Sequence, residues 1–392
     1  MSRFKKVKVG VATLLLGLSL ATPALAKDLS VKVDGQNIKL DVPPVVKESR
    51  TLVPIAPIAE QLGADVTFDS GSQTVGIKTV DKNIKISIGS KHVQVNNESQ
   101  TLDVPAEIID GRTMVPLRFV GEALGAKVNY DSSDKTVNIN YFTDMDGTLK
   151  VGGSTTIQPL TQTAADKLMS LNKGLSISIA GGGSGEGIKG ANAGTFNIGS
   201  VSRDLEAADK KDYPDLKSYD IGSDGIVVII NPKNKVDDLS KQQVIDIFTG
   251  KIKNWKEVGG ADEAIFIQTR ESGSGTLTAF EELALKKKAK VATTATPHNS
   301  NGLIKEAVSK NTNAIGFLSM GYVDKSVKAT KIEGVSPLKS KALSREWPYV
   351  RGLNVVTKGY PAGLTAKFIN YLRSTEGQAI VAQDYLPLKA QD

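Results

Sequence analysis

Three short segments in the second half of the chain combine glycine with hydroxyl side chains. They are Gly-Ser-Thr-Thr at 153–156, Gly-Gly-Gly-Ser-Gly-Glu-Gly at 181–187 and Arg-Glu-Ser-Gly-Ser-Gly-Thr at 270–276. Each follows an apolar run typical of a strand and leads into a stretch that can be helical. Free N–H groups at helix N-termini and Ser or Thr hydroxyls are donors suited to an oxyanion, and Arg270 adds positive charge. Together these segments predict a cage for a small oxyanion.

The glycine-rich segment 181–187 allows two other interpretations. Runs of glycine and serine are common in flexible linkers, but this run lies at the end of an expected strand, where open α/β sheets bind ligands. Gly185, Gly187 and Gly190 also match the spacing of a dinucleotide fingerprint, with Asp204 near the required distance. The additional glycines before this match, and the secreted location predicted below, favour the anion cage.

The N-terminus has the pattern of a secretory signal. An apolar run at 9–20 precedes the small-residue site Ala-Leu-Ala at 24–26. Four basic residues stand before the apolar run: Arg3, Lys5, Lys6 and Lys8. A membrane anchor is the alternative, but the run is shorter than the roughly 20 residues that span a bilayer. We therefore predict a signal peptide at 1–26 and a secreted protein.

Composition excludes several classes of function. The 392-residue chain carries 49 basic and 42 acidic residues, a net charge of +7 that falls to +3 without the four basic residues of the signal. Such a charge is too small to indicate nucleic-acid binding. The absence of cysteine excludes thiol catalysis, zinc–thiolate sites and lipid attachment through an N-terminal cysteine, and two histidines disfavour a metal cluster or a Ser-His-Asp triad. We expect no enzyme activity, cofactor or metal.

The first part of the chain contains a repeat with a constant offset of 62 residues. Arg-Thr-Leu-Val-Pro at 50–54 recurs as Arg-Thr-Met-Val-Pro at 112–116, and Leu-Gly-Ala at 62–64 recurs at 124–126. The apolar positions that follow also correspond: Val66, Phe68, Val75 and Ile77 match Val128, Tyr130, Val137 and Ile139. A short helix followed by two alternating strands predicts one compact α+β unit present twice.

The second part alternates between strand and helix patterns. Apolar residues recur at three-to-four spacing over 157–171 and 277–284, which predicts helices. Six apolar runs have strand character: 149–151, 175–180, 196–199, 226–230, 264–267 and 314–318. This alternation predicts an α/β fold with parallel or mixed sheets covered by helices, and the length of the part suits two lobes.

Residues 28–142 resemble the copper amine oxidase N-terminal-like domain, which is common in secreted proteins of Gram-positive bacteria. The resemblance rests on the Arg-Thr-x-Val-Pro, Leu-Gly-Ala and Val-x-aromatic-Asp motifs. Arg50 and Arg112 are expected to anchor the loop before each helix, with ligand contact as the alternative. The resemblance implies a surface or cell-wall attachment module, and 143–147 is expected to be a linker that couples the two parts loosely.

Residues 148–392 resemble the phosphate-binding proteins of phosphate ABC transporters, which have a two-lobed type II periplasmic-binding fold. The three segments occur in that family's order, with a further motif at 200–204 between the second and third. The resemblance implies that 220–228 crosses between lobes and that 314–317 returns. It places the lobes as follows: lobe 1 at about 148–224 and 324–392, lobe 2 at about 225–323.

The same resemblance implies which residues bind phosphate. They are hydroxyl, charged or backbone N–H donors and one carboxylate: Ser154, Thr155, Thr156, Ser184, Ser202, Arg203, Asp204, Arg270, Ser274, Gly275 and Thr276. Well-known members place an aspartate directly after the serine at position 202, where it accepts the proton of phosphate and rejects sulfate. Here Arg203 holds that position and Asp204 comes one residue later. Arg203 is expected to pair either with the anion or with Asp204.

The predicted function is that of a secreted substrate-binding protein at the extracellular face of the membrane or cell wall. It would capture inorganic phosphate between two lobes and deliver it to ABC transporter permease subunits, with the repeat domain possible as a cell-wall tether. The alternative is a wall-retained scavenger or sensor of phosphate, sulfate or molybdate that works without a transporter. A phosphate-handling enzyme is disfavoured because nucleophile motifs and metal ligands were not found in the sequence.

Overall fold

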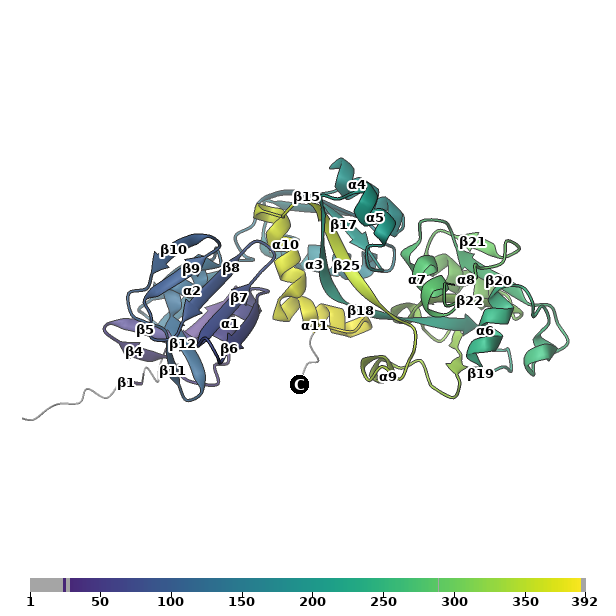
Figure 1. The fold of residues 1–392 in the computed structure, drawn as a ribbon, viewed down its shortest axis with the longest axis horizontal. Helices are drawn as coiled ribbons and strands as arrows, with labels where there is room; N and C mark the ends of the chain where they lie inside the picture. Colours follow the sequence, from purple (N-terminus) through teal and green to yellow (C-terminus); the bar gives the residue numbers. More distant parts are fainter. Residues whose placement is uncertain (1–23, 26–28, 288, 389–392) are drawn as a thin grey trace, which may run out of the picture.

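The computed structural model describes residues 24–25, 29–287 and 289–388. The predicted signal peptide lies almost entirely outside these residues. The chain forms an N-terminal domain at one end of an elongated molecule and two α/β lobes that follow it (Figure 1). Across the described ranges, no helix is long and apolar enough to cross a membrane.

The N-terminal domain consists of three sheets and two short helices, α1 (Ile55–Gln61) and α2 (Leu117–Ala123). The first sheet has the order β1 (Ala24–Leu25), β4 (Val45–Lys47), β5 (Arg50–Pro54), β12 (Arg112–Pro116) and β11 (Glu107–Ile109). The second has the order β10 (Glu98–Thr101), β9 (His92–Val95), β8 (Asn83–Ser87), β7 (Thr74–Lys78) and β6 (Asp65–Asp69). The third has the order β13 (Lys127–Asp131), β14 (Thr136–Asn140), β2 (Ser30–Val33) and β3 (Gln36–Asn37).

The two sequence repeats are related by a local two-fold arrangement. Strands β5 and β12 pair antiparallel with Val53 opposite Val115, which are equivalent residues 62 positions apart. Each repeat's arginine forms an ion pair with an aspartate of the other copy, Arg50 with Asp103 and Arg112 with Asp41. The predicted duplication is therefore confirmed, and these exposed ion pairs link the two copies.

One continuous mixed sheet extends through both lobes. Its strand order is β16 (Leu175–Gly181), β15 (Gly147–Gly153), β17 (Ile198–Val201), β25 (Val350–Lys358), β18 (Leu216–Ile230), β22 (Ala314–Ser319), β20 (Phe266–Arg270) and β21 (Thr296–His298). Three short strands lie beside it in lobe 2: β23 (Lys328–Ala329), which pairs with β18, and β19 (Asp238–Leu239), which pairs with β24 (Lys331–Ile332). The six predicted strands are all present, and the predicted α/β class is confirmed.

Helices cover both parts of this sheet. Lobe 1 carries α3 (Gln158–Leu171), α4 (Ser184–Ala193), α5 (Ala207–Asp212), α10 (Gly363–Arg373) and α11 (Thr375–Asp384). Lobe 2 carries α6 (Lys241–Phe248), α7 (Gly275–Leu283), α8 (Asn301–Lys310), α9 (Lys339–Leu343) and two 3₁₀ turns, η1 (Trp255–Val258) and η2 (Met320–Tyr322). The helices predicted over 157–171 and 277–284 correspond to α3 and α7.

The chain leaves lobe 1 for lobe 2 where expected, but it comes back to lobe 1 through a different strand from the one expected. The first part of β18 pairs with β25 in lobe 1, and its last five residues pair with β22 in lobe 2, so β18 is the outward crossing. The return is β25, whereas the expected return at 314–317 lies in β22, inside the lobe 2 sheet. Residues 324–349, expected in lobe 1, pack with lobe 2 through Ile332 and Trp347. An entirely buried apolar strand such as β22 suits the interior of a lobe rather than a hinge.

The expectation that the two parts are loosely coupled is wrong. Tyr141 and Phe142 are buried, and Asp34 Oδ1 accepts hydrogen bonds from the backbone N–H groups of Tyr141, Phe142 and Thr143 at 2.8–2.9 Å. One hydrophobic core runs from the N-terminal domain into lobe 1. The connection between the two parts is therefore packed and not loose, because Tyr141 and Phe142 belong to the core that both sides share.

Helix α10 provides most of the polar contacts between the N-terminal domain and lobe 1. The fully buried Asn370 accepts from the N–H of Val80 at 3.2 Å and donates to Asp81 at 3.1 Å. Arg373 pairs with Asp65 at 2.7 Å. These contacts fix the N-terminal domain against lobe 1, on the side away from lobe 2 (Figure 1).

Substitution of Gly63 tests the contact between the N-terminal domain and lobe 1. Its φ is +81°, and a Cβ there would lie 2.0 Å from the backbone oxygen of Asn370. Gly35 has a similar φ of +82° with open space around it. We expect Gly35→Ala to cost about 1–2 kcal/mol of stability from the left-handed conformation alone, and Gly63→Ala to cost clearly more. Calorimetric melting of both full-length variants checks this, and equal losses would contradict a rigid contact.

Candidate anion-binding site

The three glycine and hydroxyl segments converge between the two lobes. Each one follows a strand of the large sheet (β15, β16 or β20) and leads into a helix (α3, α4 or α7). Ser274 caps α7, since its Oγ accepts the N–H of Leu277 at 3.3 Å. Gly183 precedes α4 with a φ of +88°, a conformation in which L side chains are strained. The local sequence therefore directs the N-termini of α4 and α7 toward one region.

Contacts across this region join lobe 1 to lobe 2. The N–H of Gly185 donates to the oxygen of Gly273 at 3.0 Å, and the hydroxyls of Thr156 and Thr276 lie 3.1 Å apart. Most of the predicted side chains are buried here: Ser154, Thr155, Thr156, Ser184, Ser202, Arg270, Ser274 and Thr276. The lobes are therefore closed on each other, with the hydroxyl groups enclosed. We refer to these eight side chains as the hydroxyl cage.

Arg270 is a buried cation with no carboxylate partner among the residues that the structure describes. Its residue is 2% exposed, and its hydrogen bonds go to the backbone oxygens of His298 at 3.1 Å and Asn299 at 3.0 Å, and to Thr155 Oγ1 at 3.2 Å. Burial, followed by the positive charge of Arg351, lowers the pKa of the Arg270 guanidinium to about 10. A buried charge with only neutral acceptors is unfavourable by itself, so this position favours an anion.

A second buried arginine at the cage was missed by the sequence analysis. Arg351 on β25 pairs with Asp224 on β18 at 2.7 Å, and Asp224 has no exposed surface. Arg351 also donates to Thr276 Oγ1 at 2.9 Å and to Thr156 Oγ1 at 3.1 Å. Burial raises the pKa of Asp224, while the charge of Arg351 opposes this shift. Arg351 lies outside the motifs that were recognisable in the sequence. The only signal for it was a charged residue in the strand β25, which crosses between the lobes.

Two tyrosines also missed from sequence fix the backbone of the first segment. Tyr322 donates its hydroxyl to the oxygen of Thr155 at 2.7 Å, and Tyr385 donates to the oxygen of Thr156 at 2.6 Å. Burial raises the pKa of Tyr322 to about 12 and raises that of Tyr385 as well. Both hydroxyls therefore remain protonated donors at neutral pH, and they fix the Thr155 and Thr156 carbonyls in place.

The structure does not bring the side chains of Arg203 and Asp204 into the cage. Arg203 pairs with Asp209, which belongs to the capping box of α5, and also donates to the backbone oxygen of Asp204 at 2.8 Å. The carboxylate of Asp204 accepts from Asn354 Nδ2 at 3.2 Å. The Arg203 guanidinium therefore pairs with the Asp209 carboxylate and not with the expected carboxylate of Asp204.

The buried charges around the cage sum to an excess of one positive charge. Arg270 and Arg351 are both buried there, and Asp224 is the buried carboxylate that faces Arg351. Arg351 is neutralised by Asp224, so the unbalanced charge is that of Arg270. With the surrounding hydroxyl and N–H donors, the arrangement is suited to bind one small oxyanion.

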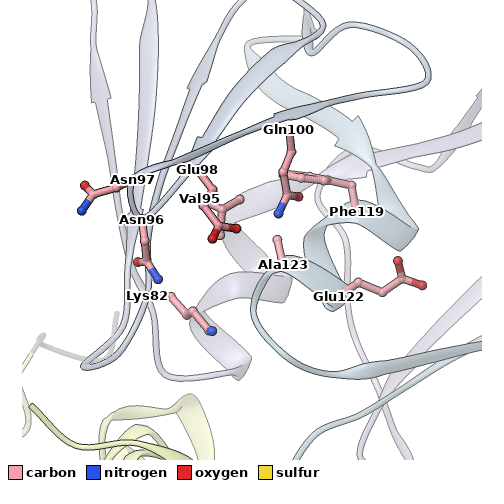
Figure 2. A pocket seen from close by; sticks show the side chains of 9 residues that line it. All are labelled: Lys82, Val95, Asn96, Asn97, Glu98, Gln100, Phe119, Glu122 and Ala123. Carbon is pink, nitrogen blue, oxygen red and sulfur yellow. The ribbon is translucent and has the colours of Figure 1, made fainter.

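Two depressions lie on the N-terminal domain. One of 660 Å³ lies beside β9, β10 and α2 and is lined by Lys82, Asn96, Gln100 and Phe119, among others (Figure 2). The neighbouring one of 930 Å³ includes Arg50, which is already paired with Asp103. None of the charged side chains that line these two depressions is buried, so they do not show the uncompensated buried charge that marks the cage.

Two family profiles match the chain. The profile of the PBP superfamily domain matches residues 143–376, and that of the copper amine oxidase N-terminal domain matches residues 32–139. The first match covers more than half of the chain and includes every residue of the hydroxyl cage. The second covers both sequence repeats.

Individual relatives are similar over the two lobes. The phosphate-binding protein PstS of Bacillus subtilis is 35% identical over 245 residues, which cover 62% of this chain and 81% of that protein. A phosphate ABC transporter substrate-binding protein from Clostridium perfringens, solved with bound phosphate, is 37% identical with a TM-score of 0.59, covering 62% of this chain and 100% of that one. An ABC-type phosphate transport receptor from Vibrio cholerae is 30% identical with a TM-score of 0.52 and the same coverage.

Proposed function

Since this chain belongs to the PBP superfamily, and within it to the family of PstS phosphate-binding proteins, we propose that it captures inorganic phosphate between its two lobes. The observation that carries this proposal is the buried Arg270 guanidinium, whose partners in the described part of the chain are a hydroxyl and backbone oxygens, with no carboxylate. A phosphate oxygen would supply the missing negative charge and accept the hydroxyl and N–H donors around it. Related proteins that are named for phosphate binding support the choice of anion.

Capture would occur by closure of the lobes. Thr155 and Ser184 belong to lobe 1, whereas Arg270 and Thr276 belong to lobe 2, so only the closed arrangement presents both sets of donors to one anion. A ligand that binds only this arrangement shifts the hinge equilibrium toward it. No bond is made or broken, so the protein is proposed to be a binding protein and not an enzyme.

The proposal includes secretion and delivery of phosphate to an ABC permease at the extracellular face of the cell. The N-terminal domain lies against lobe 1 at the end of the molecule opposite lobe 2, and it therefore leaves the space between the lobes free (Figure 1). We assign it the retention of the protein at the cell wall. Reconstitution with the permease separates this function from that of a scavenger that works alone, which would show no transport.

Titration calorimetry of the full-length protein with phosphate, sulfate and molybdate tests the proposed function. Phosphate is expected to bind with one site per chain and with the highest affinity of the three anions. Because the hydroxyl cage lacks the Arg203 and Asp204 side chains, measurements at two pH values show whether the protonated or the deprotonated form of phosphate is preferred. Tighter binding of sulfate or molybdate would overturn the choice of phosphate.

The two histidines of the chain offer a second readout. Burial, followed by the charge of Arg270, lowers the pKa of His298 below its usual 6.5. A bound anion beside Arg270 offsets that charge, so phosphate should raise the pKa of His298, as measured by NMR titration. His92, exposed on the N-terminal domain, is the internal control whose NMR signals should not respond to phosphate. An unchanged His298 titration at saturating phosphate would place the anion elsewhere.

A further inference from the structure

The two buried arginines of the cage differ in how many of their N–H groups are already used. An arginine side chain has five N–H donors. Arg270 uses Nε and Nη2, and its Nη1 makes no hydrogen bond within the residues that the structure describes. Arg351 instead uses all three nitrogens: Nε bonds Asp224, Nη2 bonds Asp224 and Thr156, and Nη1 bonds Thr276 and Ser202. Arg270 therefore has donors to offer an anion, and Arg351 does not.

We propose that Arg351 is a positioning residue, which orients the hydroxyl groups of the cage and does not itself contact the anion. This inference rests on the proposed function, because it concerns how the same site recognises phosphate. It assigns different roles to two residues of the same type and charge that lie in the same site.

The hydrogen bonds around Thr156 show how the orientation arises. Thr156 Oγ1 accepts from Arg351 Nη2 at 3.1 Å and from Asn301 Nδ2 at 3.0 Å, which occupies both of its lone pairs. Its own proton must therefore point to its remaining neighbour, Thr276 Oγ1, 3.1 Å away. Thr276 Oγ1 then accepts from Thr156 and from Arg351 at 2.9 Å, so the Thr276 proton is the one left for an anion.

Asp224 holds Arg351 in the geometry that this network needs. Its Oδ2 accepts from Nε at 3.1 Å and from Nη2 at 2.7 Å, while its Oδ1 accepts the hydroxyl of Ser319 at 2.8 Å. The carboxylate also neutralises Arg351, whose charge would otherwise add to that of Arg270 in a buried space. The pair is thus fixed in both orientation and charge.

The same network couples hydroxyl orientation to closure of the lobes. Arg351 lies on the crossing strand β25, Thr156 and Ser202 lie in lobe 1, and Thr276 lies at the start of α7 in lobe 2. Only the closed form gives Arg351 its contact with Thr276. In the closed form the donors are therefore oriented by contacts within the protein and need not be ordered by the anion itself, which lowers the entropic cost of binding.

A double-mutant cycle with phosphate calorimetry tests this role. Arg351→Lys keeps the charge beside Asp224, but an ammonium has three donors and cannot bridge the carboxylate and three hydroxyl-bearing residues. We expect Arg351→Lys and Thr276→Val each to weaken phosphate binding by roughly 10- to 100-fold. Because Arg351 acts through Thr276, the two effects should not multiply. The double variant should bind phosphate at most about 3-fold less tightly than the single variant with the lower affinity.

Thr155→Val is the matched control, since Thr155 Oγ1 accepts from Arg270 and not from Arg351. The effects of Arg351→Lys and Thr155→Val should multiply. The positioning role would be overturned if the losses of affinity from Arg351→Lys and Thr276→Val multiplied in the double variant, or if Arg351→Lys bound phosphate as tightly as the wild type. Either result would leave the proposed function intact. Failure of the wild-type protein to bind phosphate would overturn both.

Melting of each variant shows whether it is folded. If Arg351→Lys does not fold, the neutral double replacement Arg351→Met with Asp224→Asn takes its place, because it removes both members of the buried ion pair together. In that background Thr276→Val should weaken phosphate binding by less than about 3-fold, since the network that oriented Thr276 is already gone. A loss as large as in the wild-type background would overturn the proposal.

Discussion

Arg270→Met is expected to weaken phosphate binding by about two to three orders of magnitude, the largest effect of any single substitution considered for this protein. The substitution removes the unbalanced positive charge and the free Nη1 donors, and each hydrogen bond to a charged group contributes about 1.5–3 kcal/mol. Methionine fills most of the volume and introduces no new charge. Without phosphate the melting temperature of the variant should be no lower than that of the wild type, because the substitution removes an uncompensated buried charge.

Calorimetry with phosphate measures this effect, and Arg345→Met is the matched control. Arg345 is exposed beyond the end of α9, in a segment that packs with lobe 2. Its replacement changes the net charge by the same amount but should leave the affinity unchanged. If Arg270→Met bound phosphate as tightly as the wild type, the anion could not lie at the cage, and the proposed function would lose its main support.

Gly275→Ala is expected to weaken phosphate binding by roughly 10- to 100-fold through closure rather than through charge. A Cβ at Gly275 would lie 2.1 Å from Ser184 Oγ and 3.0 Å from Ser184 Cβ when the lobes are closed. Rotation of the Ser184 hydroxyl would not clear the second contact, and it would break the bond that Ser184 Oγ accepts from the N–H of Ser202 at 3.1 Å. The lobes must therefore remain further apart, or the cage must lose a donor.

Gly302→Ala in α8 is the matched control for this steric effect. Gly302 is also a helical glycine near a helix start in lobe 2, and the nearest atom to an added Cβ is 3.8 Å away. Calorimetry gives the affinity of both variants, and small-angle scattering with and without phosphate gives their compaction. Full compaction of Gly275→Ala with wild-type affinity would show that the close approach of α7 to Ser184 is not needed for binding.

Features that depend on residues close in the chain were predictable. The alternation of strands and helices follows from hydrophobic periodicity, and the duplicated domain follows from motifs repeated at a constant offset. The oxyanion segments were recognisable because a strand, a glycine turn and a helix start are consecutive in sequence. For the same reason Thr155, Ser184 and Arg270 could be named before their positions in space were known.

Features that depend on contacts between distant residues were not predictable. Arg351 and Asp224 are 127 positions apart and meet only because β25 pairs with β18 along the hinge. Arg203 directly follows Ser202 in sequence, yet its side chain pairs with Asp209 in α5 and not with groups of the cage. The linker at 143–147 was expected to be loose from its length, but Tyr141 and Phe142 directly before it are buried in a core shared by two domains.

The sequence by itself determined the α/β class, the duplicated N-terminal domain and the donors that make an oxyanion cage, because each depends on a pattern of residues that can be recognised along the chain. The tertiary structure decided which charges are buried and unpaired, which lobe each donor occupies and which arginine has N–H groups free. The physical reason is that burial, neutralisation and hydrogen-bond saturation are properties of a residue's surroundings in space, which sequence neighbours only partly supply.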